Sequence, residues 1–218
     1  MNHIYALKFG ESTIAESQVY QNGDRNVRLP ISFTMYLIQS GDRLILVDAG
    51  CYTMPDFEMH YFCGPRPLLL QLGADPTSIT DVILTHAHHD HVEAVGEYTN
   101  ATVYLERREY KEAKPYLQKT ERLVLFDDEH ELLEDVRIKR VGGHSIGSCI
   151  VKVKTQKGEF VIVGDECYAR DCLTHQRPIG SAVDREASNR FLSEYRSSNA
   201  LLCHENILSG QNGILKIV

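Results

Sequence analysis

The sequence lacks several features that mark whole classes of protein. No apolar run approaches the ~20 residues that a membrane-spanning helix requires, and no stretch is of low complexity or has the composition of a linker. No internal repeat is evident either. These absences argue against membrane-spanning helices, a repeat array and a string of tethered modules. We therefore expect a single domain over residues 1–218, a length that suits one domain of ordinary size.

The sequence also lacks the marks of an exported or disulfide-bonded protein. Residues 1–5 show neither the charged region nor the long apolar region of a secretion signal. No two cysteines form a Cys-x-x-C pair, so free thiols in a reducing, cytoplasmic setting are the expectation. The six cysteines are Cys51, Cys63, Cys149, Cys167, Cys172 and Cys203.

An excess of basic residues is absent as well. The formal net charge is −7, which argues against nucleic acid as a partner because phosphate binding needs a clustered basic surface. The short stretch Glu106-Arg107-Arg108 is interpreted as a solvated helix face. With neither a membrane nor nucleic acid expected, the predicted partner is a small-molecule substrate, and the sequence leaves the oligomeric state open.

Apolar runs and turn residues predict the secondary structure in outline. Strands dominate the start of each half and helices come later, which indicates an α+β protein with two sheets and helices outside them. The segment 51–67, with three prolines, either covers a site or connects elements. Predicted strands cover 4–9, 33–39, 43–48, 82–84, 102–105, 136–141, 149–155, 159–163 and 201–203, and predicted helices cover 67–72, 91–98, 106–117 and 184–199.

Metal-binding side chains are concentrated directly after the strand 82–84, in the order His86-x-His88-x-Asp90-His91. Two histidines two residues apart in a tight loop can face one ion. Asp90 and His91 begin the next helix and can face a second ion. Imidazole and carboxylate together suit zinc, iron, manganese or cobalt.

Three further residues, His144, Asp165 and His204, each follow a strand-like run. Side chains at strand ends can converge while the sheets supply rigidity. One alternative is a single zinc site with the remaining groups arranged behind it. Asp165 argues against that alternative, because a carboxylate between two histidine clusters is a natural bridge.

These motifs resemble a known family. The segment 85–91 (Thr-His-Ala-His-His-Asp-His) is similar to the signature of the metallo-β-lactamase superfamily. The segment 143–148 resembles its second histidine motif, with Ile146 where proline is usual. Gly164-Asp165 resembles the bridging-aspartate motif and His204 the last ligand. The match spans nearly the whole chain in the family's order.

The resemblance implies a four-layer αββα sandwich of two mixed sheets, with a dinuclear centre at one edge. A metal-bridging hydroxide would be the nucleophile, and Asp90 is placed to take or relay a proton. The implied cofactors are two divalent ions, zinc before iron, manganese or cobalt. The implied ligands are His86, His88 and His144 for the first ion, Asp90, His91 and His204 for the second, and Asp165 for both.

Within the superfamily, the spacing Asp165-x-x-Tyr168 resembles the N-acyl-homoserine lactonase branch. In that branch the tyrosine lies beside the substrate carbonyl, where a phenol can donate a hydrogen bond. The other interpretation is that Tyr168 only packs. We expect hydrolysis of a lactone or related carboxylic ester. The alternatives are a small phosphodiesterase on the same two metals and a ligand-binding module with little turnover.

The remaining candidate residues carry weaker expectations. His89 is expected to point away from the metals, and Cys203 to be a small buried residue facing away from its neighbour His204. Three lone histidines, His60, His130 and His175, are expected on the surface or in loops rather than as ligands. Five apolar or aromatic residues of the 51–67 segment either line an acyl pocket or simply anchor the segment to the core: Met54, Phe57, Met59, Tyr61 and Phe62.

Overall fold

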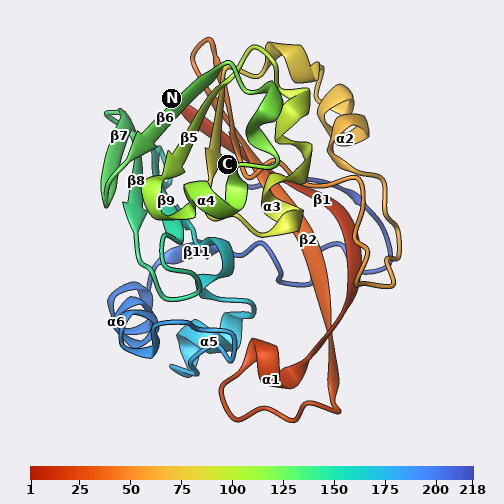
Figure 1. Cartoon of the computed structure of the whole chain (residues 1–218), viewed down its shortest axis with the longest axis vertical. Coiled ribbons are helices and arrows are strands. Elements are labelled where there is room, and N and C mark those ends of the chain that lie inside the picture. Colours follow the sequence, from red (N-terminus) through yellow and green to blue (C-terminus); the bar gives the residue numbers. More distant parts are fainter.

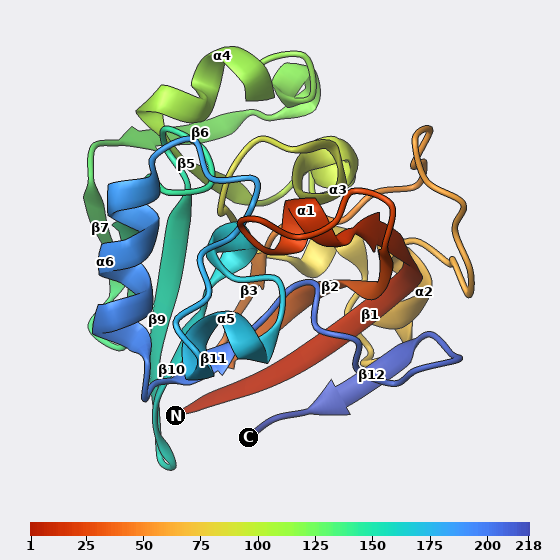
Figure 2. The same cartoon turned by 90° about the horizontal axis from the view of Figure 1, so that it is seen from below.

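The computed structural model describes residues 1–218 and shows two stacked sheets enclosed by helices (Figure 1). Figure 2 shows the layers from one side to the other: helix α6 (Arg185–Tyr195), a five-stranded sheet, a seven-stranded sheet and helix α2 (Pro65–Gln71). The expected α+β class and four-layer αββα architecture are confirmed. None of the helices has the length and apolar character needed to cross a membrane.

The larger sheet has the strand order β12-β1-β2-β3-β4-β5-β6. It is mixed, because β12, β1, β2 and β3 pair antiparallel whereas β3 to β6 pair parallel. The parallel strands therefore all end at the same edge. The bounds are β1 (Asn2–Ala15), β2 (Arg28–Ser40), β3 (Arg43–Val47), β4 (Asp81–Leu84), β5 (Thr102–Glu106), β6 (Arg122–Phe126) and β12 (Gly213–Lys216).

The smaller sheet has the order β11-β10-β9-β8-β7 and is also mixed, since β10 and β11 are parallel and the other pairs antiparallel. Its bounds are β7 (Glu129–Leu133), β8 (Val136–Arg140), β9 (Cys149–Thr155), β10 (Gly158–Ile162) and β11 (Asn199–Leu201).

The central strands of the larger sheet are buried on both faces. Along β2, Tyr36 and Ile38 point to one face of the sheet and belong to the core between the two sheets. Met35 and Leu37 point to the other face and belong to another core, which includes residues of α2. A strand covered on both sides needs apolar residues at every position rather than at alternate ones. This explains the continuous apolar runs in the sequence.

Strands β1 and β2 extend beyond the sheet as a long hairpin with helix α1 (Glu16–Val19) at its tip (Figure 1). The tip contacts residues 176–183, a segment that we call the strap. The strap runs between helix α5 (Arg170–Thr174) and α6. Gly180 and Ser181 both donate backbone hydrogen bonds to the Gln18 carbonyl, at 3.0 and 3.1 Å. The Arg177 guanidinium lies 3.5 Å from the centre of the Tyr20 ring.

Two predicted helices differ from the structure. The segment 106–117 is broken into the 3₁₀ turn η3 (Arg107–Glu109), helix α4 (Tyr110–Ala113) and the 3₁₀ turn η4 (Leu117–Lys119). Pro115 lies at the break, where it cannot donate to a continuing helix. The predicted helix 91–98 consists of α3 (His89–Val92) and the 3₁₀ turn η2 (Glu93–Glu97).

Other boundaries were also wrong or missing. Helix α6 ends at Tyr195 rather than 199, and its N-cap Asp184 accepts from the Ala187 amide at 3.0 Å. The solvated-face interpretation holds for Arg107 but not for Glu106, whose fully buried carboxylate pairs with Arg108. The sequence reasoning missed α1, α5, β6, β7 and β12, together with the 3₁₀ turns η1 (Pro76–Ser78) and η5 (Gly164–Glu166).

Candidate metal centre

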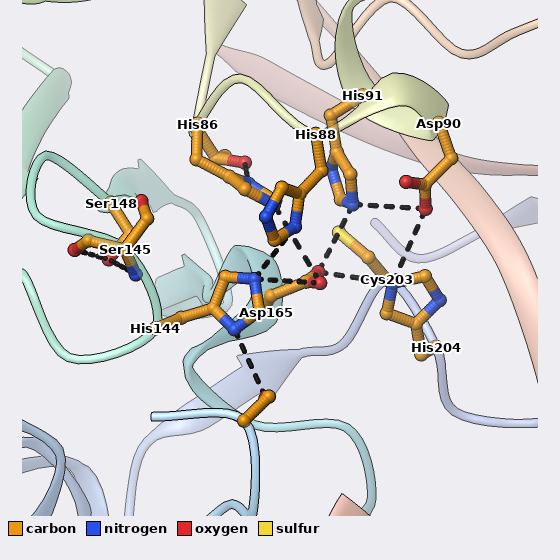
Figure 3. Close-up of polar contacts among 12 residues, drawn as sticks. His86, His88, Asp90, His91, His144, Ser145, Ser148, Asp165, Cys203 and His204 are labelled. Carbon is orange, nitrogen blue, oxygen red and sulfur yellow. Dashed lines mark hydrogen bonds and ion pairs between the residues drawn. The ribbon is translucent and has the colours of Figure 1, made fainter. Parts of the chain in front are cut away.

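Four chain segments bring all seven predicted metal-binding residues to one place (Figure 3). The first motif follows β4 and runs into α3, and His144 lies in the loop between β8 and β9. Asp165 lies in η5 directly after β10, and His204 follows β11. Each segment follows a strand, so the sheets fix the positions from which the side chains converge.

The first ligand group consists of His86, His88, His144 and Asp165, whose ligand atoms all lie within 4.8 Å of one another. His144 Nε2 is 3.0 Å from His88 Nδ1. Asp165 Oδ2 is 3.4 Å from His144 Nε2 and 3.7 Å from His86 Nε2. These atoms surround a common point. Hydrogen bonds within the protein do not satisfy all of them.

The second ligand group consists of Asp90, His91 and His204. Asp90 Oδ2 lies 3.2 Å from His91 Nε2 and 3.6 Å from His204 Nε2. Asp165 Oδ1 lies 3.1 Å from each of the same two nitrogens. Asp165 thus presents one oxygen to each group, and Figure 3 shows it between them.

The donor set fits two divalent cations. His86 Nε2, His91 Nε2 and Asp165 Oδ1 are buried polar atoms that have no hydrogen-bond partner. An orphaned buried polar atom is costly, so three of them aimed at one region call for cations. Imidazole nitrogen and carboxylate oxygen are the ligands expected for first-row transition metals.

Asp48, His91 and Cys203 form another close group, but it lies behind the second ligand group. Asp48 already accepts from the Thr85 amide at 2.8 Å, from Thr85 Oγ1 at 2.9 Å and from His91 Nδ1 at 2.8 Å. Its carboxylate therefore orients the His91 ring and leaves Nε2 toward Asp165. Cys203 is fully buried with Sγ 3.9 Å from Asp48, as expected for a small residue facing away from His204.

Four of the imidazoles have a hydrogen-bond partner on the nitrogen that faces away from the centre. Such partners fix the tautomer and the orientation of the ring and tune its basicity. The pairs are His86 Nδ1 with Thr85 Oγ1 at 3.1 Å, His91 Nδ1 with Asp48 Oδ2 at 2.8 Å, His144 Nδ1 with Ser181 Oγ at 3.2 Å, and His204 Nδ1 with the Ser32 carbonyl at 2.8 Å.

The two groups differ in their electrostatics when no cation is present. Burial lowers the pKa of His86 well below its usual value and that of His144 to about 4. Burial also disfavours the charged form of His91, but the surrounding carboxylates, Asp90 first, raise its pKa well above the usual value. The pKa of His204 is raised in the same way, against burial, by Asp165. Cation binding must therefore displace protons from the second group.

Sequence reasoning missed two buried glutamates that hold the His144 loop. Glu109 accepts hydrogen bonds from the Ala87 amide at 3.0 Å, Ser145 Oγ at 2.7 Å and the Gly147 amide at 2.8 Å. It thereby ties the first histidine motif to the second. Arg108 precedes it in the sequence and Lys111 follows two residues later, so the local pattern indicated a solvated face and not a buried carboxylate.

Glu166 holds the same loop from the other side. It accepts from the Gly143 amide at 3.1 Å, the His144 amide at 3.2 Å and Ser148 Oγ at 2.5 Å. Burial raises its pKa to about 7. A β-carbon on Gly143 would lie 2.4 Å from Glu166 Oε2, so only glycine leaves room for this carboxylate. Gly143 is the sequence signal that could have indicated a buried group at this position.

Tyr168 lies directly beside the ligand groups. Its ring stacks on His204 with centroids 5.1 Å apart and contacts His144 edge-on at 6.0 Å. Its hydroxyl is 3.5 Å from Ser181 Oγ. Burial, together with the charge of Asp165, raises the pKa of Tyr168 well above its usual value. The phenol is therefore protonated at neutral pH and can donate a hydrogen bond.

A cavity of about 320 Å³ opens over the centre, bordered by His88, Asp90, His144, Asp165 and His204. Tyr168 and Ser181 line its inner part, and no lysine or arginine lines it. The cavity has a polar metal-side floor and an apolar wall. The wall is formed by Ile14, Ile31, Phe33, Met54 and Phe57.

The side chains of the 51–67 segment were expected either to line an acyl pocket or to anchor the segment to the core, and both roles occur. Met54 and Phe57 line the cavity. Met59 and Phe62 pack against the core instead, and Phe62 lies 6.4 Å from Phe9 between ring centroids. Tyr61 is 53% exposed and takes neither role.

The other histidines lie away from the ligand groups, and all but His130 lie as expected, since His130 is part of strand β7. His60 and His175 are exposed, and His130 is half-buried against Tyr104. His89 points away from both ligand groups, with one ring nitrogen 3.2 Å from the Tyr116 hydroxyl and the other 2.9 Å from the Thr53 carbonyl.

Comparison with protein families agrees with this geometry. Residues 33–197 match the model of the metallo-beta-lactamase superfamily. The chain belongs to this superfamily and is a metal-dependent hydrolase.

Individual relatives are similar over almost the whole chain. The N-acyl homoserine lactonase AiiB of Agrobacterium fabrum is 27% identical over 262 residues, covering 94% of each chain. An N-acyl homoserine lactone hydrolase with the product N-hexanoyl-L-homoserine at its catalytic metal centre has a TM-score of 0.82 at 19% identity, covering 94% of this chain and 93% of its own. The lactonase AidC, described as a dizinc enzyme, has a TM-score of 0.73 at 14% identity, covering 98% and 94%. The structural likenesses establish the shared fold.

Proposed function

We propose that the protein is a dinuclear hydrolase that opens the ring of acylated lactones such as N-acyl homoserine lactones. One observation carries this proposal: a single cavity combines residues of the two ligand groups, a buried phenol and an apolar wall, and contains no lysine or arginine. The lactonase relatives support the same substrate class.

The first cation would be held by the first ligand group, the second cation by the second ligand group, and Asp165 would contact both. The cations, when bound, supply ionised water at neutral pH and polarise the scissile carbonyl. We propose zinc at both positions, which is what AidC is described as containing. A cytoplasmic location stays a prediction from the sequence.

Asp90 and Tyr168 are the proposed catalytic residues. Asp90 borders the cavity and is the only carboxylate of the second group besides the shared Asp165. It can take the proton of the attacking water and pass it to the alkoxide that leaves when the ring opens. Tyr168, kept protonated by burial, donates to the carbonyl oxygen as negative charge develops there.

The lining of the cavity distinguishes a lactone from a phosphodiester. An acyl chain gains about 25 cal/mol per Å² of apolar surface removed from water, which the apolar wall can provide. A phosphodiester brings a negative charge, and apart from the two cations the cavity offers no lysine or arginine to bind it. Phosphodiester hydrolysis is therefore the weaker alternative.

A substrate panel tests the proposal. Metal-analysed protein is assayed with N-acyl homoserine lactones of increasing chain length, an aryl ester and bis(p-nitrophenyl) phosphate. We expect lactone hydrolysis, with kcat/KM rising as the chain lengthens. Tyr168→Phe should keep its metals and lose at least about tenfold in kcat, which corresponds to about 1.4 kcal/mol. Phosphodiester cleavage without lactone turnover would move the protein to the other substrate class.

A further inference from the structure

Ser181 stands between a proposed metal ligand and the proposed oxyanion donor. Its Oγ lies 3.2 Å from His144 Nδ1 and 3.5 Å from the Tyr168 hydroxyl, and its side chain lines the cavity. None of the sequence motifs includes Ser181. Its role must be read from these contacts alone.

The direction of the hydrogen bonds follows from the ring of His144. Nε2 of this ring faces His88 and Asp165 in the first ligand group, so when it ligates a cation the proton of the neutral imidazole resides on Nδ1. Nδ1–H then donates to Ser181 Oγ, and the serine hydroxyl is free to donate onward. The other hydrogen-bond partner of this hydroxyl is the Tyr168 oxygen, at 3.5 Å.

This direction has a consequence for Tyr168. A phenol oxygen that accepts from Ser181 keeps its own O–H for another acceptor. The neighbouring Asp165 can compete for this O–H, since its carboxylate is one of the groups that raise the pKa of Tyr168. With the Asp165 oxygens directed to two bound cations, the remaining acceptor is a substrate oxygen in the cavity. Hydrogen bonds in such a chain also polarise one another, which makes the terminal phenol a better donor.

The serine is held in place by its backbone rather than by substrate. The Ser181 and Gly180 amides donate to the Gln18 carbonyl, and the Val183 amide donates to the Gly143 carbonyl at 2.9 Å. A β-carbon on Gly180 would lie 1.8 Å from the Ser17 carbonyl oxygen, which shows how closely the strap approaches α1. The hydroxyl is thus preorganised between the hairpin tip and the His144 loop.

We propose that Ser181 is a positioning residue that directs the Tyr168 hydroxyl into the cavity and fixes the ring of His144. The proposal rests on the proposed lactonase function for the Tyr168 part, whereas the His144 part concerns metal affinity alone. If Ser181 only filled space, its effect on the rate would not depend on the Tyr168 hydroxyl. Its removal would also leave the metal affinity at His144 unchanged.

A double-mutant cycle tests the link to Tyr168. In the wild-type background, Ser181→Ala should lower kcat for the lactone by about tenfold, with KM changed by less than about twofold. In the Tyr168→Phe background the same substitution should change kcat by less than about twofold, because the hydroxyl that it directs is gone. Ser181→Thr keeps the hydroxyl and should retain most of the rate. Ser193→Ala, which removes an exposed hydroxyl from α6, is the matched control.

Zinc affinity tests the link to His144 without any assay of turnover. In competition with a chromophoric chelator, Ser181→Ala should weaken one of two zinc equivalents by about tenfold, whereas Tyr168→Phe and Ser193→Ala should not. Equal rate losses in both backgrounds together with unchanged zinc affinity would overturn the proposal. If the wild type opens no lactone, the proposed function fails, but the zinc measurement still decides whether Ser181 supports His144.

Discussion

The two ligand groups share Asp165 but are supported differently. Behind the first group, His86 and His144 bond to the side-chain hydroxyls of Thr85 and Ser181. Behind the second group, the partner of His91 is the carboxylate of Asp48 and the partner of His204 is a backbone carbonyl.

The difference predicts unequal metal sites. A carboxylate behind an imidazole makes the ring a stronger ligand than a neutral hydroxyl does, and a backbone partner fixes it more rigidly. The opposite pKa shifts of His91 and His86 show the same contrast in the absence of cations. We expect a chelator to remove the cation of the first group first. The predictions that follow are ordered from the largest expected effect to the smallest.

Asp165→Ala should have the largest effect, because it should prevent metal binding at both ligand groups. Asp165 is the carboxylate that presents an oxygen to each group, with Oδ1 at 3.1 Å from His91 and Oδ2 at 3.4 Å from His144. We expect little bound metal by elemental analysis and no hydrolysis. Asp56→Ala, which removes another carboxylate that borders the cavity, should keep its full metal content. Normal metal content in the Asp165 variant would show that it is not the bridge.

Asp48→Asn should weaken the second site more than the first. An amide cannot replace the charged acceptor behind His91, and loss of such a partner costs about 10–100-fold in metal affinity. The two affinities are measured by chelator competition, and they should move closer together. The matched control is Asp81→Asn, a buried aspartate of the same sheet that pairs with Arg43 instead. Equal weakening of both zinc equivalents would contradict the separate support of the two sites.

Glu109→Gln should weaken the first site, by a smaller factor. The amide keeps one acceptor oxygen but places an NH₂ group against an N–H or O–H donor, so at least one of three bonds is lost. We expect a loss of about threefold to tenfold in the weaker zinc affinity, with the tighter one unchanged. Glu112→Gln, at an exposed position on α4, is the control. A change confined to the tighter site would refute the assignment.

Lys8→Met should loosen the chain that follows His204. The fully buried Lys8 ammonium bonds Glu11 Oε2 at 2.6 Å and the Leu208 carbonyl at 2.8 Å. Removing it should cost about 1.5–3 kcal/mol of unfolding free energy, the range for hydrogen bonds to charged groups. Urea unfolding of zinc-free protein measures this loss.

The same variant should also change the pH dependence of stability. Burial opposes ionisation of Glu11, but the bond from Lys8 lowers its pKa below the usual 4.5. A lowered carboxyl pKa stabilises the fold above about pH 4.5, and this contribution is lost as the pH falls through the lowered value. Wild-type stability should therefore decline more steeply than that of Lys8→Met below about pH 4.5. Parallel pH profiles would show that the pair contributes no linkage.

The metal-binding segments could be predicted from the sequence because their signals are local. His86 to His91 lie within six residues, and each of the other proposed ligands directly follows an apolar strand. Glu109 and Ser181 could not be predicted, since their partners lie in segments far away along the chain. Helix 106–117 was predicted as continuous because its polar pattern outweighed Pro115, which interrupts it in the fold.

The long β1–β2 hairpin has an evolutionary consequence. Its tip supplies Ile14, Gln18 and Ile31 to the cavity and, through the Gln18 carbonyl, also holds Ser181. A lengthened or shortened tip would alter which acyl chains fit and, at the same time, shift a hydroxyl beside Tyr168. Mutations selected for a new substrate at this tip should therefore show epistasis with Ser181, and their benefit should depend on which residue occupies that position.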